Sequence, residues 1–167
     1  MSNAKPTRTH KESKWLLDPH IEAKHAILRR YLAGWFPVMA RFNKRLVFID
    51  GFAGPGSYVD GEPGSPVIAL KTLIEHAAFE NMSSTEFVFV FLEAEEDRHQ
   101  HLAKSLEEYA SSIGGWPPNV RVTHRCVSFA DGAEEILSSL EASGAKLAPA
   151  LVFIDPFGVS GLSLIHI

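Results

Sequence analysis

The chain has 167 residues, 46% of them hydrophobic, and a formal net charge of -4. This length fits one domain of about 100–200 residues, and the apolar content excludes a wholly disordered chain. No apolar run reaches the roughly 20 residues of a membrane span, and the polar N-terminus does not have the pattern of a secretory signal. Because Cys126 is the single cysteine, an internal disulfide and a multi-cysteine zinc site are excluded, and we expect a cytoplasmic protein.

The net charge is the sum of two unlike segments. Residues 1–46 carry ten Lys and Arg against three Asp and Glu, a net +7, whereas residues 47–167 carry six against seventeen, a net -11. We therefore divide the chain into a basic helical N-terminal segment, residues 1–45, and a sheet-forming part, residues 46–167. The basic segment suits an acidic partner.

The predicted elements begin with a helix and then alternate between strands and helices. Asp18 and Pro19 are typical of a helix start, apolar residues recur at helical spacing as far as Met39, and Pro37 is expected to kink or split this helix. Buried strands are predicted at 46–50, 87–92 and 151–155, and a weaker strand at 120–127. The helices between them are predicted at 67–79, 95–113 and, capped by Asp131, 131–140. This order predicts an α/β fold with a parallel sheet and right-handed crossovers.

Three of the four predicted strands end in an acidic residue, namely Asp50, Glu93 and Asp155. Ligands of open α/β sheets bind beyond the carboxyl ends of the strands, and a lone buried carboxylate is energetically costly. A single such residue is explained equally well as a helix cap or a turn former. Three that converge at one sheet edge favour a polar ligand site.

The glycine-rich stretch FIDGFAGPG at 48–56 follows the first strand and precedes a helix. Its spacing is G-x-x-G-x-G, unlike the dinucleotide fingerprint, so a nicotinamide or flavin cofactor is disfavoured, and no P-loop motif is present. An ordinary glycine-rich turn is the alternative. The order D-x-F-x-G-x-G resembles the S-adenosylmethionine loop of class I methyltransferases, which passes under the methionine and ribose of the cofactor. The resemblance assigns to the cofactor Asp50, Gly51, Phe52, Ala53, Gly54 and Gly56.

Glu93 ends the second strand, where an acid of a cofactor-binding Rossmann sheet accepts hydrogen bonds from ribose hydroxyls. It lies 37 residues after Gly56, against the usual interval of about 20, so residues 57–65 would be an insertion. The alternative is that Glu93 only caps the next helix. Ser128 and Phe129 end the third strand, where an adenine ring often packs.

Asp155, Pro156 and Phe157 follow the fourth strand and precede Gly158. They resemble the Asp-Pro-Pro-aromatic motif of methyltransferases that act on exocyclic amines. In that family the acid and a proline carbonyl accept hydrogen bonds from the target amine. Here a phenylalanine replaces the second proline and Gly158 takes the aromatic position. The three residues are the catalytic candidates, with a turn-forming Asp155 as the alternative.

Two other features are given structural interpretations. His99 and His101 are two residues apart on a predicted helix, so their rings point to different faces and no metal site is expected. Cys126 is interpreted as a small buried apolar residue.

Together the motifs resemble the three-Cys-motif partner protein family (TcmP) over about residues 14–162. The residues that carry the resemblance are Lys24, Ile27, Leu28, Tyr31, Leu32 and Trp35, the FIDGFAGPG stretch with Tyr58, GSP at 64–66 and IDPFG at 154–158. The resemblance implies a prokaryotic protein with a Rossmann-like class I methyltransferase fold. It also implies S-adenosylmethionine as cofactor and a three-Cys-motif protein encoded nearby as partner.

The chain departs from that family in length, because family members are longer and have more strands. It holds the first four strands only, which would leave the fourth strand as an open edge. Residues 163–167 resemble a translated sequencing adapter. We therefore expect a truncated chain; the alternative is a short variant completed by another chain.

Two functions are compatible with these motifs. The first is an S-adenosylmethionine-dependent methyltransferase acting on an unidentified acceptor. That acceptor would be nucleic acid if the basic residues bind phosphate, although a solvated helix flank explains the same residues. They are Lys24, Arg29, Arg30, Arg41, Lys44 and Arg45. The second is a degenerate Rossmann-like module that binds a three-Cys-motif protein without catalysis.

Overall fold

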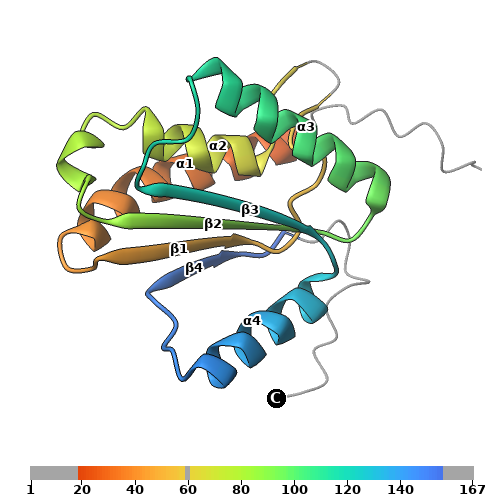
Figure 1. The fold of residues 1–167 in the computed structure, drawn as a ribbon. Helices are drawn as coiled ribbons and strands as arrows, with labels where there is room; N and C mark the ends of the chain where they lie inside the picture. The colour runs from red at the N-terminus through yellow and green to blue at the C-terminus, as the bar shows by residue number, and fades with distance from the viewer. Residues whose placement is uncertain (1–18, 59–60, 156–167) are drawn as a thin grey trace, which may run out of the picture.

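The computed structural model describes residues 19–58 and 61–155 of the chain, and Figure 1 shows their arrangement. Within these residues the elements alternate as the sequence predicts. In chain order they are α1 (Pro19–Ala40), β1 (Arg45–Asp50), α2 (Ser65–Ile74), the 3₁₀ helix η1 (Glu80–Met82), β2 (Glu86–Glu93), α3 (Glu96–Ser112), β3 (Val120–Cys126), α4 (Phe129–Ser143) and β4 (Ala150–Phe153). No described helix combines the length and apolarity needed to cross a membrane.

The four strands form one parallel sheet in the order β3-β2-β1-β4. The predicted α/β, Rossmann-like parallel sheet is thus confirmed. The chain builds outward from β1 through β2 to β3 and then returns to place β4 on the other side of β1. The switch point therefore lies between β1 and β4, and ligands of such sheets bind at the carboxyl ends of the strands there.

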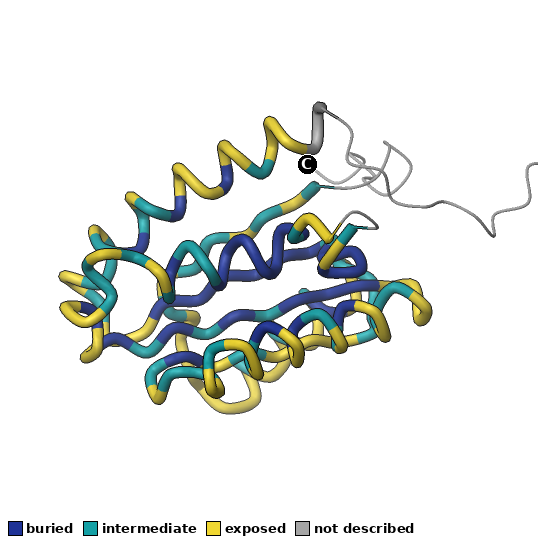
Figure 2. Tube along the Cα trace, turned by 90° about the horizontal axis from the view of Figure 1, so that it is seen from above, coloured by how far each residue is buried: buried dark blue, intermediate teal, exposed yellow. Residues whose placement is uncertain are grey.

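Helices cover both faces of the sheet. In Figure 1, α1, α2 and α3 lie on one face and α4 lies on the other. Seen from above in Figure 2, α2 lies between α1 and α3 and is mostly buried. The larger core fills the space under these three helices; Phe36 of α1 packs there against Phe87 and Phe89 of β2. The smaller cluster, on the face of α4, contains Val47, Ile49 and Leu92.

Pro37 does not split α1, which continues to Ala40. Proline has no N–H group, so the carbonyl of Ala33 loses its intrahelical partner. The Nε2–H of His76 donates to that carbonyl at 3.1 Å, while the His76 Nδ1 accepts from the N–H of Ala78 at 3.0 Å. The carbonyl that the proline leaves unpaired is thus satisfied from the turn after α2.

Two predicted helix boundaries are wrong for local reasons. The helix α2 ends at Ile74 rather than at residue 79, since the chain after it turns around His76 and then forms η1. The cap of α4 is Ser128, whose hydroxyl accepts from the N–H of Asp131 at 3.2 Å and donates to the Asp131 carboxylate at 2.6 Å. Asp131 is therefore the partner of the cap and not the cap itself.

Candidate functional site

The glycine-rich loop after β1 crosses the carboxyl ends of both neighbouring strands. The N–H of Gly51 donates to the carbonyl of Phe153, and the N–H of Ala53 donates to that of Leu92. Ala53 is buried in the core. The loop therefore joins β4 to β2 across the end of β1.

Two glycines of this loop have positive φ, 63° at Gly54 and 79° at Gly56, a region that L side chains rarely adopt. Gly56 also lies against α3: a Cβ atom there would be 2.9 Å from the Cβ of Ser105 and 3.1 Å from Cδ1 of Leu102. Packing against α3 therefore requires a glycine at position 56, whether or not a ligand lies over the loop. By contrast, nothing lies within 4 Å of the corresponding position at Gly54, so its outer side is open.

Asp50 is fully buried at the end of β1. Its carboxylate accepts from the hydroxyl of Ser65 at 2.6 Å and from the N–H of Phe52 at 3.1 Å. Burial raises the pKa of Asp50 to about 7, even though both hydrogen bonds act to lower it, and the charges of Asp155 and Glu93 raise it further. Asp50 thus fixes the loop to the start of α2 and changes protonation near neutral pH.

Glu93 is buried at the end of β2 and links the loop to α3. One of its oxygens accepts from the N–H of Gly54 at 2.9 Å. The other accepts from the N–H of Glu95 and from Nε of Arg98, both at 2.9 Å, and pairs with Arg98 Nη2 at 2.7 Å. Glu93 is not the cap of α3, because that position is held by Glu95. A carboxylate has about four lone-pair sites, so the chain's own donors occupy most of this acceptor.

Asp155 lies two residues beyond β4 and faces the N-terminal helix. Lys24 of α1 donates to its carboxylate at 2.5 Å, across a sequence separation of 131 residues. Nearby, the rings of His25 and Tyr58 lie 5.8 Å apart. Burial lowers the pKa of His25, against the opposing charge of Asp155, whereas burial and then the charges of Asp155 and Asp50 raise the pKa of Tyr58.

The remaining predicted site residues are only partly placed. Pro156 and Phe157, the other two catalytic candidates, lie outside the described residues. Phe129 stacks obliquely on Phe52 with centroids 6.0 Å apart, and a Cβ on Gly51 would lie 2.5 Å from its ring. The expectation that Ser128 and Phe129 end the third strand is wrong, because β3 stops at Cys126, Ser128 caps α4 and Phe129 is its first residue. The fold therefore brings the start of α4 against the glycine-rich loop.

The six predicted phosphate-binding residues are all exposed, but two of them have carboxylate partners. Lys24 pairs with Asp155, and Arg45 pairs with Glu86, which also pairs with Arg121. These partners reduce the charge that Lys24 and Arg45 offer to a phosphate. The other four of the six exposed residues are Arg29, Arg30, Arg41 and Lys44.

The outer surface of α1 also carries apolar side chains. The stripe of α1 that packs against the core contains Leu28, Leu32 and Phe36, whereas Ile27 and Tyr31, one position before Leu28 and Leu32, are 68% and 55% exposed. Which of these two neighbouring apolar rows faces the core is decided by how the helix packs on the sheet, and the spacing alone does not show it.

Three contacts of the site were not predicted from the sequence: Ser65 to Asp50, Lys24 to Asp155 and Arg98 to Glu93. Ser65 stands within the GSP motif, so its position was visible although its partner was not. The partners of Lys24 and Arg98 depend on how α1 and α3 lie over the sheet edge, which no spacing reveals.

Comparison with known proteins adds no family assignment. The sequence profiles of known protein families give no match to the chain, and neither do the sequences of curated proteins.

Proposed function

We propose that this protein is a cytoplasmic S-adenosylmethionine-dependent methyltransferase related to the TcmP family. The observation that supports it best is the 2.9 Å hydrogen bond from the N–H of Gly54 to Glu93. It joins a loop of positive-φ glycines after β1 to a buried acid at the end of β2. In an open α/β sheet these two positions hold, respectively, the body of a nucleotide cofactor and its ribose hydroxyls.

The described residues fit this cofactor after one adjustment. The methionine and ribose would lie over residues 51–56, and the adenine would lie near Ser128 and Phe129. Glu93 would bind the ribose hydroxyls with the oxygen that now pairs with Arg98. Arg98 would therefore move aside or share this oxygen when the cofactor binds.

The acceptor would bind beside Asp155. When bound, S-adenosylmethionine supplies an electrophilic methyl group, and the protein has to orient an acceptor lone pair toward it. The carboxylate of Asp155, with Pro156 and Phe157, would hold the acceptor through its hydrogens. Lys24, which pairs with Asp155, would keep that carboxylate directed toward α1.

The acceptor class that the surface of α1 and of the connection after it favours is nucleic acid. Arg29, Arg30, Arg41 and Lys44 are exposed and would neutralise phosphates, which makes binding depend steeply on salt. A three-Cys-motif protein is the partner that the family resemblance adds.

Calorimetric titration with S-adenosylmethionine and with S-adenosylhomocysteine tests the proposal. The purified protein should bind both, and Glu93→Ala should weaken binding about ten- to a hundredfold, because hydrogen bonds to a charged group contribute about 1.5–3 kcal/mol. Glu107→Ala removes an exposed acid of α3 and should leave binding unchanged. A well-folded wild-type protein that binds neither ligand refutes the proposal.

A second candidate function is a non-catalytic module that binds a three-Cys-motif protein. It is favoured by Glu93, whose oxygens already accept from the chain's own donors, and by the exposed side chains of Ile27 and Tyr31. It predicts that the two proteins co-purify, that Tyr31→Ser disrupts the pair, and that Asp155→Asn does not. Loss of the complex on Asp155→Asn would count against it.

A further inference from the structure

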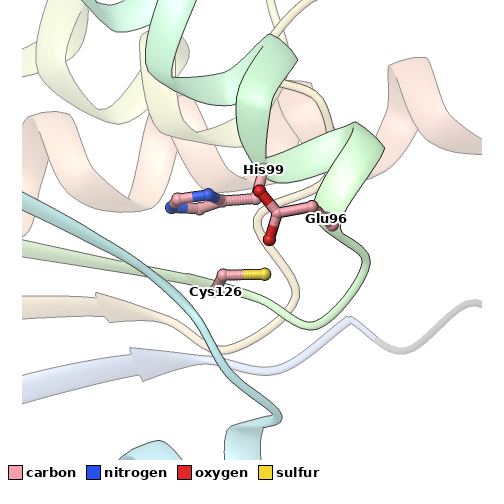
Figure 3. Close-up of side chains that lie close together, drawn as sticks. All are labelled: Glu96, His99 and Cys126. Atoms are coloured by element: carbon pink, nitrogen blue, oxygen red, sulfur yellow. The ribbon is translucent and has the colours of Figure 1, made fainter.

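A cluster of side chains with metal-binding chemistry lies beside the candidate cofactor site, on its outer flank. Glu96 and His99 come from the first turn of α3, and Cys126 is the last residue of β3; Figure 3 shows the three around one space. Their ligand atoms all lie within 4.8 Å of one another. His124 adjoins them, with its Nδ1 2.9 Å from Nε2 of His99.

The fold brings these residues together in two steps. Glu96 and His99 are three residues apart on a helix and so share one face, and His124 and Cys126 are two apart on a strand and also share a face. The turn between β2 and α3 is short, and Cys126 pairs in register with Glu93. The start of α3 therefore passes directly over the end of β3.

We propose that Glu96, His99 and Cys126 bind a zinc ion. Carboxylate oxygen, imidazole nitrogen and thiolate sulfur are the three ligand types that Zn²⁺ takes in proteins, and three protein ligands with a water in the fourth position is a common arrangement. Because Nε2 of His99 faces His124, the Nδ1 of His99 is the atom directed to the ion. His124 is then a positioning residue that orients the imidazole of His99.

The geometry requires only a modest closure. Metal–ligand distances of 2.0–2.3 Å in a tetrahedral site imply ligand atoms about 3.3–3.8 Å apart. The present separations lie within 4.8 Å, so the three side chains would have to close around the ion by about 1–1.5 Å at most. Imidazole and thiolate ligands also favour zinc over magnesium or calcium, which prefer oxygen alone.

The local charge favours a dication. The thiol of Cys126 hydrogen-bonds to Glu96, and the negative charges of Glu96, Glu93 and Glu95 act on it. A bound cation would stabilise the thiolate that it coordinates. Binding therefore releases the thiol proton to solvent, and the acidic surroundings hold the ion.

The bound ion would join the first turn of α3 to the end of β3. Between these two points lie Ala94, whose carbonyl is 3.8 Å from the Cys126 sulfur, and Glu95, whose N–H donates to Glu93. Zinc would thereby hold the turn that follows Glu93. This site does not depend on the proposed cofactor.

Titration of the tag-free, metal-free protein with Co²⁺ and then Zn²⁺ tests the proposal. The wild-type protein should bind one Co²⁺ with a thiolate-to-cobalt charge-transfer band, and Zn²⁺ should displace it. Cys126→Ala should abolish the band. Glu96→Gln and His99→Ala should weaken Zn²⁺ binding at least tenfold in competition with a chromogenic chelator. His124→Ala should keep the band and weaken binding about ten- to a hundredfold, as loss of an outer-shell partner does.

The matched control is His101→Ala, because His101 is exposed on the same helix two residues from His99. This variant should bind Zn²⁺ like the wild-type protein. Circular dichroism of each metal-free variant separates loss of binding from loss of fold. The proposal is overturned if the wild-type protein shows no charge-transfer band, or if Cys126→Ala or His99→Ala binds Zn²⁺ as tightly as the wild-type protein does.

Discussion

The substitution Asp50→Asn should make the protein more stable at neutral pH and change how its stability depends on pH. The pKa of this carboxyl group is about 7 in the folded state against a model value of 3.8. Because the folded pKa is the higher one, the folded state binds more protons than the unfolded state between these values. The contribution of Asp50 to stability is therefore greatest at low pH and is lost as pH rises from about 4 to about 7.

The size of the effect follows from the same two values. A difference of 3.2 pKa units between 7 and 3.8 corresponds to about 4 kcal/mol at 1.36 kcal/mol per unit. Asparagine has the same shape and does not ionise. Its oxygen still accepts from the N–H of Phe52, and its amide group donates to the hydroxyl of Ser65, reversing the bond now at 2.6 Å.

Urea unfolding of the wild-type protein and of Asp50→Asn, at intervals from pH 4.5 to 8, measures this difference directly. The variant should gain several kcal/mol relative to the wild-type protein as the pH rises across that range. Other carboxylates, such as Glu86, whose pKa is lowered by Arg121 and Arg45, act in the opposite direction and cancel in the comparison. Asp97→Asn, at an exposed position, controls for the change in net charge. A difference that stays constant with pH would refute the reasoning, since Asp50 would then be ionised in the folded state throughout.

Three further substitutions test the packing of the glycine-rich loop and of the core. Gly56→Ala and Gly61→Ala both place a side chain at φ near +80°, which costs about 1–2 kcal/mol, but only the new methyl group at position 56 meets Ser105 and Leu102. Urea unfolding should therefore show Gly56→Ala to be the more destabilising by about 1–3 kcal/mol. Equal losses of stability in the two variants would contradict the contact. Tyr109→Phe should raise the free energy of unfolding by about 1 kcal/mol, because among the described residues the buried Tyr109 hydroxyl finds no hydrogen-bond partner. A destabilised phenylalanine variant would mean that the hydroxyl is satisfied.

The strands of this fold could be predicted because their sequences leave few alternatives. Runs such as LVFID and FVFVFL are too short for helices and too apolar for surface loops. Alternation with helices then requires parallel pairing. The predicted edge position of the fourth strand is also confirmed among the described strands, since β4 pairs only with β1 there.

The positions of Asp50 and Glu93 could be predicted from the same pattern, but their partners could not. Both residues were expected at strand ends and are found there. Their hydrogen bonds to Ser65 and Gly54 span 15 and 39 residues. Such contacts depend on where the loop and α2 settle over the sheet, which a one-dimensional pattern does not contain.

The Glu96, His99 and Cys126 cluster illustrates the same limit. The sequence directs attention to His99 and His101, which look close but lie on different faces of a helix. The contributing strand residue, Cys126, is 27 positions after His99 and was interpreted as a buried apolar residue; it is in fact half-buried. Only the crossing of α3 over β3 makes these side chains neighbours.

The return of the chain to β1 sets an order in which the site can assemble. The strands β1 and β2 pair across about 40 residues, whereas β4 pairs with β1 across about 100 and over only four positions. Closing the longer loop costs about 1 kcal/mol more in entropy, and β4 gains fewer paired positions in return. We therefore expect β4 to dock last and to detach first. When β4 opens, the Gly54–Glu93 half of the site stays intact, while Asp155 moves away with the strand. Local unfolding at β4 would therefore expose the surroundings of Asp155 and leave the contact between Gly54 and Glu93 folded.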